Sequence, residues 1–137
     1  MHAAVQGSAP VVAITADADR RAILSGLSGD PALTFTDGAQ TRAEVGLTAG
    51  GLPGLHLIGP AGQRQLSMTV DRDGQQALVT VRDAGGRSRA SVGVVQGATV
   101  INLSDEARTR VVMGVAPDGR ASLSFLDEAG QIVRTLP

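Results

Sequence analysis

The chain has 137 residues, which is enough for one domain and too few for two ordinary ones. Its 12 basic residues, all of them Arg, are balanced by 13 acidic residues, so it has no strong field that would attract a nucleic acid or an anionic membrane surface. The absence of Cys excludes disulfides and thiolate metal sites, and the absence of Tyr and Trp argues against ring-lined surfaces for sugars or single-stranded nucleic acids.

The start of the chain carries no targeting pattern that we recognise. The first ten residues contain no basic region followed by an apolar one, as an intact secretory signal would. We expect residues 1–10 to be a flexible segment and residues 11–137 to form a single β-repeat domain. No apolar run is long enough for a spanning helix, which argues against direct membrane insertion. A cytoplasmic location is the default expectation, and a processed cell-envelope protein is the alternative.

A short motif, apolar-x-apolar-x-Asp, recurs along the chain. Its last position falls at residues 37, 59, 83, 105 and 127, with Gly in place of Asp at position 59, so the intervals are 22, 24, 22 and 22 residues. A sixth and more degenerate unit precedes these at Val11–Thr15. Fixed spacing of this kind is typical of a repeat architecture, in which every unit has the same local structure.

Each unit predicts a β-hairpin. Apolar and polar residues alternate on both sides of a short turn, such as Asp83–Gly86 or Asp127–Gly130. The Asp side chain can bond its own backbone and Gly can adopt a positive φ, as tight turns require. Six units predict roughly twelve strands. A short helix near Asp17–Leu24 is the one local alternative that we consider.

The fold class that follows is all-β, an antiparallel meander of about six hairpin repeats of 22 residues. A meander with one apolar face must roll up, fold into two layers, close into a barrel or pair with another chain. The inward residues are small and aliphatic, and they would underfill a wide barrel. A β-trefoil also has six hairpins and is the alternative architecture, although its threefold symmetry predicts a period of about 44 residues.

Two further positions of the repeat recur. Gly stands three residues after the Asp position in several units, and Arg stands five residues after it. Over residues 11–137 this pattern resembles short bacterial β-hairpin repeats, loosely including the tyrosine–aspartate repeats of Rhs-type shell proteins, although the Tyr of that family is absent here. The resemblance implies a scaffold or an enclosure rather than a catalyst, and no catalytic residue carries over from it.

The recurring Arg residues are the candidate binding site: Arg20, Arg42, Arg64 and Arg110. If the hairpins lie side by side, these residues could form a ladder that holds carboxylates or phosphates bidentately. The competing interpretation is cross-strand pairing with the turn Asp residues. The near balance of acids and bases favours pairing.

Two other candidates for chemistry are weaker. His56 alternates with Leu55 and Leu57, so we expect an ordinary exposed His on the solvent side of its strand, and a single His predicts no metal site. Asp71–Gly74 resembles the start of a calcium loop, but such a loop needs a Glu where this chain has Arg82. We therefore expect a turn whose Asp side chains bond the backbone.

The sequence contains no convincing catalytic set, and it predicts no cofactor. We expect a non-enzymatic structural or protein-interaction module built from β-hairpin repeats, whose partner is another protein or further copies of the chain in a homo-oligomer. Nucleic acid is not an expected partner. The alternative is a domain of the β-trefoil or small-barrel type that binds a carbohydrate or another small ligand.

Overall fold

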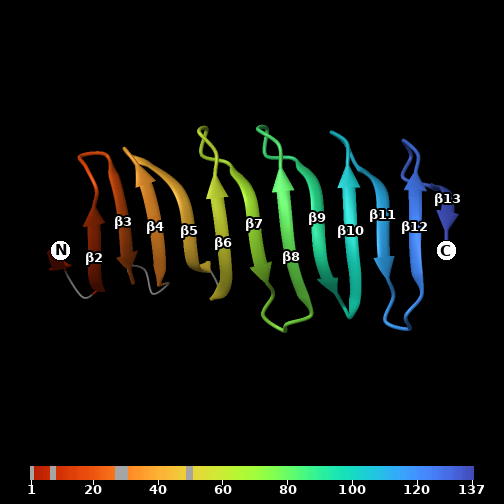
Figure 1. The fold of residues 1–137 in the computed structure, drawn as a ribbon, viewed down its shortest axis with the longest axis horizontal. Coiled ribbons are helices and arrows are strands. Elements are labelled where there is room, and N and C mark those ends of the chain that lie inside the picture. Colours follow the sequence, from red (N-terminus) through yellow and green to blue (C-terminus); the bar gives the residue numbers. More distant parts are fainter. Residues whose placement is uncertain (1, 7–8, 27–30, 49–50) are drawn as a thin grey trace.

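The structure is a computed structural model that describes residues 2–6, 9–26, 31–48 and 51–137, and it consists of strands joined by turns (Figure 1). The strands are β1 (His2–Gln6), β2 (Ala9–Thr15), β3 (Arg20–Ser25), β4 (Ala32–Asp37), β5 (Gln40–Thr48), β6 (Leu52–Ile58), β7 (Arg64–Val70), β8 (Gln76–Arg82), β9 (Ser88–Val95), β10 (Ala98–Ser104), β11 (Thr109–Val115), β12 (Ala121–Leu126) and β13 (Ile132–Leu136). The described residues include no helix that could cross a membrane.

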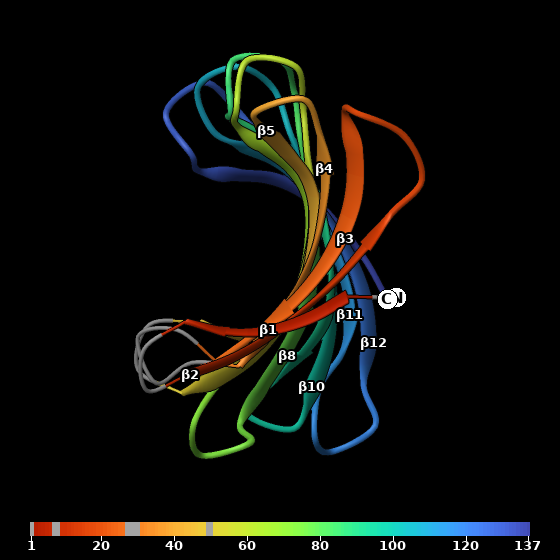
Figure 2. The same ribbon diagram turned by 90° about the vertical axis from the view of Figure 1, so that its left-hand side faces the viewer.

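All thirteen strands belong to one sheet, and their order from edge to edge is their order in the sequence. Each strand pairs antiparallel with its neighbours in the chain. The predicted all-β antiparallel meander of hairpins is therefore confirmed. Because β1 and β13 are the two edges, the sheet is open, and neither a closed barrel nor the alternative β-trefoil is formed. Viewed along the sheet, the strands form a single layer bent into an arch (Figure 2).

The Asp residues of the repeat organise the hairpin turns, as predicted. In the β8–β9 hairpin, Asp83 Oδ1 accepts hydrogen bonds from the backbone N–H groups of Gly85 (2.9 Å) and Arg87 (3.0 Å). Gly86 of the same turn has a φ of 81°, a conformation that residues with a Cβ rarely adopt. Asp127 accepts the equivalent two bonds in the β12–β13 turn. The turn prediction for Asp83–Gly86 and Asp127–Gly130 is confirmed.

A register shift recurs next to these turns. It occurs in the hairpins β4–β5, β6–β7, β8–β9, β10–β11 and β12–β13, each time where one extra residue lies on the returning strand. An extra residue of this kind is a β-bulge, which bends its strand and increases the local twist. The sequence repeat thus produces a repeated bulge along one end of the sheet.

The N-terminal part of the sheet differs from the sequence prediction in two respects. Residues 2–6 and 9–10 lie in the paired strands β1 and β2, so they belong to the sheet instead of forming a flexible segment before it. The helix considered near Asp17–Leu24 is also wrong, because Arg20–Ser25 forms β3. Strand β3 hydrogen-bonds to β2 on one side and to β4 on the other, and this pairing outweighs the local helix propensity.

Alternation along the strands gives the sheet an apolar face and a polar face. On the apolar face, one row of side chains lies in register across β2–β13, and we call it the aliphatic row: Val12, Leu24, Leu33, Val45, Leu55, Met68, Val79, Val92, Ile101, Met113, Leu123 and Leu136. The first residue of each clear repeat motif lies in this row. The repeat in the sequence therefore corresponds to one line of contact across the sheet.

The adjoining row on the polar face has a different chemistry. Its members across β4–β13 are mostly small and hydrogen-bonding: Thr34, Glu44, His56, Ser67, Thr80, Ser91, Asn102, Val112, Ser124 and Thr135. Asn102 Nδ2 donates to Ser91 Oγ at 3.2 Å, and the hydroxyls of Ser124 and Thr135 lie 3.1 Å apart. We call this the polar row. Neighbouring strands are thus also linked through their side chains on this face.

The sheet encloses no hydrophobic core. No hydrophobic side chain among the described residues is buried, and the buried polar side chains are those of His56 and Ser67. Sixteen large hydrophobic residues in the described part of the chain are exposed, most of them on the apolar face. The described strands form one layer, so nothing in the described part of the chain covers the apolar face.

Candidate functional site

The apolar face exposes many large hydrophobic side chains. The aliphatic row is flanked by a second apolar row that includes Phe35, Leu57 and Val81. Side chains near the middle of the face remain about half exposed, for example Met68 at 45% and Val92 at 43%. A contiguous exposed apolar surface of this extent usually marks a site of association or ligand binding.

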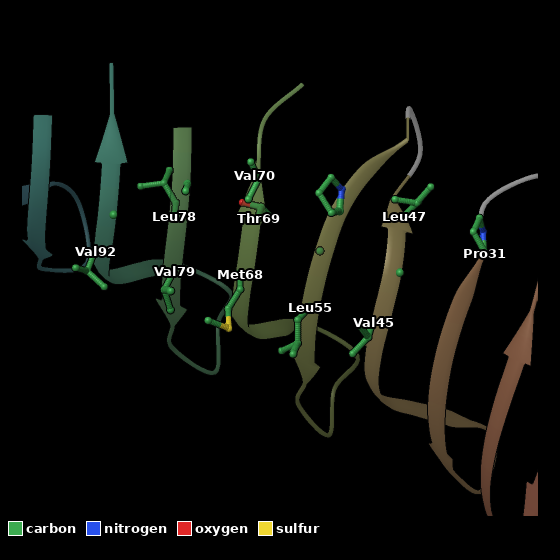
Figure 3. A pocket seen from close by; sticks show the side chains of 15 residues that line it. Pro31, Val45, Leu47, Leu55, Met68, Thr69, Val70, Leu78, Val79 and Val92 are labelled. Atoms are coloured by element: carbon green, nitrogen blue, oxygen red, sulfur yellow. The ribbon is translucent and has the colours of Figure 1, made fainter. Parts of the chain in front are cut away.

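A hollow of about 830 Å³ lies in the middle of the sheet (Figure 3). Its wall is formed by strands β5 to β9, together with Pro31 just before β4. The lining side chains are aliphatic, with Met68 and proline among them, and Thr69 is the one member of the lining set with a polar side chain. No charged residue is part of this lining. The set of residues around the hollow is therefore apolar apart from Thr69, whose side chain alternates with that of Met68 and points to the opposite face of β7.

Several glycines within the strands lie beside the hollow and mark close contacts between neighbouring backbones. Gly46, Gly54 and Gly93 line the hollow, and in the register they lie in one row, next to the polar row. A Cβ on Gly46 would meet the carbonyl oxygen of Pro31 at 2.5 Å, and a Cβ on Gly93 would collide with that of Ala77. Strand-interior glycine is typical of such close approaches between neighbouring backbones. Recurrent glycine within a strand is therefore a sequence signal for such close approaches.

The four Arg residues at one sequence position do not share one position in the sheet. Arg42 and Arg110 are the extra residues of two bulges, whereas Arg64 pairs with Ile58 and Arg20 lies opposite Asp37. The turns of these hairpins differ in length, so equal spacing from the motif does not give equal register. The expected single ladder of Arg20, Arg42, Arg64 and Arg110 is thus divided between different positions of the sheet.

Ion pairs with turn carboxylates are present at two of these four residues. Arg110 Nε lies 3.1 Å from Asp105 Oδ2, and Arg20 Nε lies 3.8 Å from Asp17 Oδ2. Arg89, which is also a bulge residue, lies 3.6 Å from Asp83 Oδ2. These contacts agree with the pairing interpretation of the recurring Arg residues.

His56 occupies the polar face, opposite in direction to Leu55 and Leu57 as predicted, but it is not exposed. Its side chain is 2% accessible, and in the register it stands between Glu44 and Ser67. Neither ring nitrogen has a hydrogen-bond partner. Burial lowers the pKa of His56, the positive charge of Arg64 lowers it further, and Glu44 opposes the shift. The expectation of an ordinary exposed His is therefore wrong.

The loop Asp71–Gly74 has the geometry of a turn. Asp71 Oδ1 accepts a hydrogen bond from the backbone N–H of Gln76 at 2.9 Å, and the N–H of Gly74 donates to the Asp71 carbonyl oxygen at 3.3 Å. Gly74 has a φ of 67°. Within the described residues, no group of three or more His, Cys, Asp or Glu side chains is placed to hold a metal ion.

No protein-family model matches this chain, and no curated protein is significantly similar to it. The apolar face offers contact area and exclusion of water, and its hollow offers an aliphatic lining without charge.

Proposed function

We propose that this chain is a non-enzymatic structural module that self-associates by packing its apolar face against the apolar face of a second copy. The observation that carries the proposal is the aliphatic row, which crosses twelve strands without a layer to cover it. Two such sheets pack at a distance of about 10 Å when their inner side chains interdigitate. The resemblance to β-hairpin repeats of shell proteins points in the same direction, because those proteins are scaffolds or enclosures.

The available area suits a stable homodimer. Thirteen strands at a spacing of about 4.8 Å make a face roughly 60 Å wide, and strands of about six residues make it roughly 20 Å tall. Each copy can then contribute on the order of 1,200 Å², and two copies about 2,400 Å², which lies in the range of obligate homodimers. The side chains are already about half buried, so covering each gains on the order of 1 kcal/mol.

A like surface is the best partner because the face is uncharged over most of its area. The side chains of the aliphatic row are all apolar, so a partner needs neither countercharge nor hydrogen-bonding groups there. An identical face meets this requirement without any further protein. Closed two-fold association is also the commonest symmetry of soluble oligomers.

The edge strand β13 disfavours the addition of a further strand from another copy. Strand β13 is short, and the register shift within the β12–β13 pair marks a bulge. Arg134 lies opposite Phe125, where preceding strands carry apolar residues, and Pro137 follows the strand. Features of this kind protect an exposed edge from pairing with another chain: a short strand, a bulge, a charge on the apolar face and a proline. Association through the face is therefore favoured over association through this edge.

Size-exclusion chromatography with light scattering tests the proposal. The wild-type chain should have at least twice the monomer mass of 13.9 kDa. Met113→Glu places a charge in the aliphatic row outside the hollow and should produce monomers, whereas Thr80→Glu in the polar row is the matched control and should leave the mass unchanged. A wild-type chain that stays monomeric at micromolar concentration would refute the proposal, as would a Met113→Glu variant that keeps the oligomeric mass.

A further inference from the structure

The chain contains three Asp-Gly steps, Asp37–Gly38, Asp73–Gly74 and Asp118–Gly119, and each lies at a hairpin turn. At such a step the side-chain carboxyl group of Asp can react with the backbone nitrogen of Gly, because glycine has no Cβ that hinders the approach. The product is a cyclic succinimide. The reacting residues are the same at all three steps, so the surrounding structure decides which of them reacts most readily.

We propose that Asp73–Gly74, in the turn between β7 and β8, is a site of spontaneous isomerisation of aspartate to isoaspartate. The Gly74 nitrogen forms a bond to Asp73 Cγ, the bond from Cγ to the hydroxyl oxygen of the carboxylic acid breaks, and that oxygen leaves as water with the amide proton. Water then attacks the main-chain carbonyl carbon of Asp73, and the bond from this carbon to the Gly74 nitrogen breaks. One water molecule leaves and one enters, and the main chain now runs through Cγ. The proposal does not depend on self-association.

The carboxylate of Asp73 is exposed, and it is free to rotate. Among the described residues, none forms a hydrogen bond or an ion pair with it. At Asp118, by contrast, both carboxylate oxygens are held by Arg120. Oδ1 accepts a hydrogen bond from the Arg120 backbone N–H at 3.2 Å, and Oδ2 lies 2.8 Å from Arg120 Nε. Cγ of Asp118 therefore reaches the nitrogen of Gly119 only after these contacts break.

The attacking nitrogen is also held most weakly at Gly74. Its N–H donates to the carbonyl oxygen of Asp71 at 3.3 Å, whereas the corresponding hydrogen bonds of Gly119 and Gly38 measure 2.9 Å and 2.7 Å. A length of 3.3 Å exceeds the usual range of about 2.7–3.2 Å for such bonds. The nitrogen of Gly74 is therefore released for attack more readily than the other two.

The backbone of the β7–β8 turn is also the least restricted of the three. Pro117 has a fixed φ at the second position of the β11–β12 turn, where the β7–β8 turn has Arg72. Asp37 lies within β4 and is paired with both β3 and β5. The rotation that brings Cγ to the following nitrogen thus disturbs the fewest contacts at Asp73.

Isomerisation lengthens the main chain of this turn by one methylene group. Two hydrogen bonds close the turn around Asp73: the N–H of Asp71 donates to the carbonyl oxygen of Gln76 at 2.9 Å, and the N–H of Gln76 donates to Asp71 Oδ1 at 2.9 Å. A longer loop fits neither bond. Because β7 is the central strand of the thirteen, the change loosens a hairpin in the middle of the sheet (Figure 1).

The test is incubation of the purified full chain in heavy-oxygen water, followed by tryptic digestion in ordinary water and mass spectrometry. The three steps fall in separate tryptic peptides, residues 22–42, 73–82 and 111–120. Hydrolysis of a succinimide adds one solvent oxygen to the product, and electron-transfer fragmentation distinguishes isoaspartate from aspartate. In the folded chain, Asp73 should isomerise at least about fivefold faster than Asp37 or Asp118.

Incubation in urea is the control for the sequence itself, and the three rates should converge there. Arg120→Gln releases the Asp118 carboxylate and should raise the rate at Asp118 in the folded chain, whereas Asp73→Glu should not react, because its longer side chain is poorly placed for ring closure. Equal rates at the three steps of the folded chain would overturn the proposal. So would the same preference for Asp73 in urea, or isoaspartate at Asp73 without solvent oxygen.

Discussion

His56 and Ser67 lie directly opposite each other on β6 and β7, and they are the buried polar side chains of the described structure. The two have different surroundings. Ser67 Oγ accepts a hydrogen bond from Arg82 Nη1 at 3.0 Å, whereas both ring nitrogens of His56 are without a partner. A buried polar group without a partner costs about 1–3 kcal/mol. Ser67 therefore has its hydrogen bond, whereas buried His56 lacks one and lowers the stability of the folded protein.

We predict that His56→Thr stabilises the folded protein by about 1 kcal/mol. Thr already occupies the polar row at Thr34 and Thr80, so the smaller side chain fits the chemistry of that row. The substitution removes two unsatisfied nitrogen atoms from the interior of the row. Urea denaturation at fixed protein concentration measures the change, since association also contributes to apparent stability. A lower unfolding midpoint for His56→Thr than for wild type would show that packing of the ring outweighs its missing hydrogen bonds.

Acidification below the ordinary His pKa is expected to destabilise the wild-type protein through the same residue. The folded pKa of His56 is lowered from 6.5, first by burial and then by Arg64. Below pH 6.5 the unfolded chain therefore binds a proton that the folded chain does not bind, so stability falls until the pH passes the folded pKa. Above pH 6.5 this contribution is constant. Urea midpoints measured between pH 8 and pH 5 should decline for wild type and change less for His56→Thr; parallel profiles would assign the decline to other groups.

Asp83 is predicted to give a second, more acidic transition. Hydrogen bonds from the backbone N–H of Arg87, and then the positive charge of Arg87, lower the pKa of this carboxyl group below 3.8. Its stabilising contribution is present above pH 3.8 and is lost as the pH falls through the folded pKa. Asp83→Asn keeps an oxygen acceptor for the turn but loses the charge, so it should lack this pH dependence and be less stable than wild type at pH 7, whereas Asp83→Ala also loses the acceptor and should be less stable still. Thermal unfolding between pH 2.5 and pH 7 measures both effects. Equal stability of the two variants at pH 7 would contradict the role of the side chain in the turn.

Gly93→Ala is predicted to destabilise the protein by about 2 kcal/mol or more, because the new methyl group meets the carbonyl oxygen of Ala77 on β8. Gly26→Ala is the control, since a Cβ there has no atom within 4 Å. The control should be neutral or slightly stabilising, because Ala reduces the entropy of the unfolded chain. Thermal unfolding compares the two variants. Similar stability of Gly93→Ala and wild type would mean that β8 and β9 can separate locally without cost.

The candidate site was predictable only in part. The aliphatic composition of the apolar face follows from the alternation in the repeats, and Leu33, Leu55 and Val79 indeed lie in one row. The hollow was not predicted, because its lining is brought together from five neighbouring strands and from Pro31. Conversely, the spacing that aligned Arg42 with Arg64 in the sequence gave a false correspondence in space. One lies at a bulge and the other is paired with Ile58.

The sequence by itself determined the local elements: where the strands alternate, where Asp and Gly turn the chain, and which side chains share a face. These properties depend on residues close together in the chain. Alternation with a period of two, followed by a turn that contains Asp and Gly, is compatible with few local structures other than a β-hairpin. Tertiary structure alone decided that the sheet stays open as one layer, that His56 is buried, and that the Arg residues separate. The physical reason is that bulges, register and twist accumulate over thirteen strands, so these features depend on backbones that are distant in sequence.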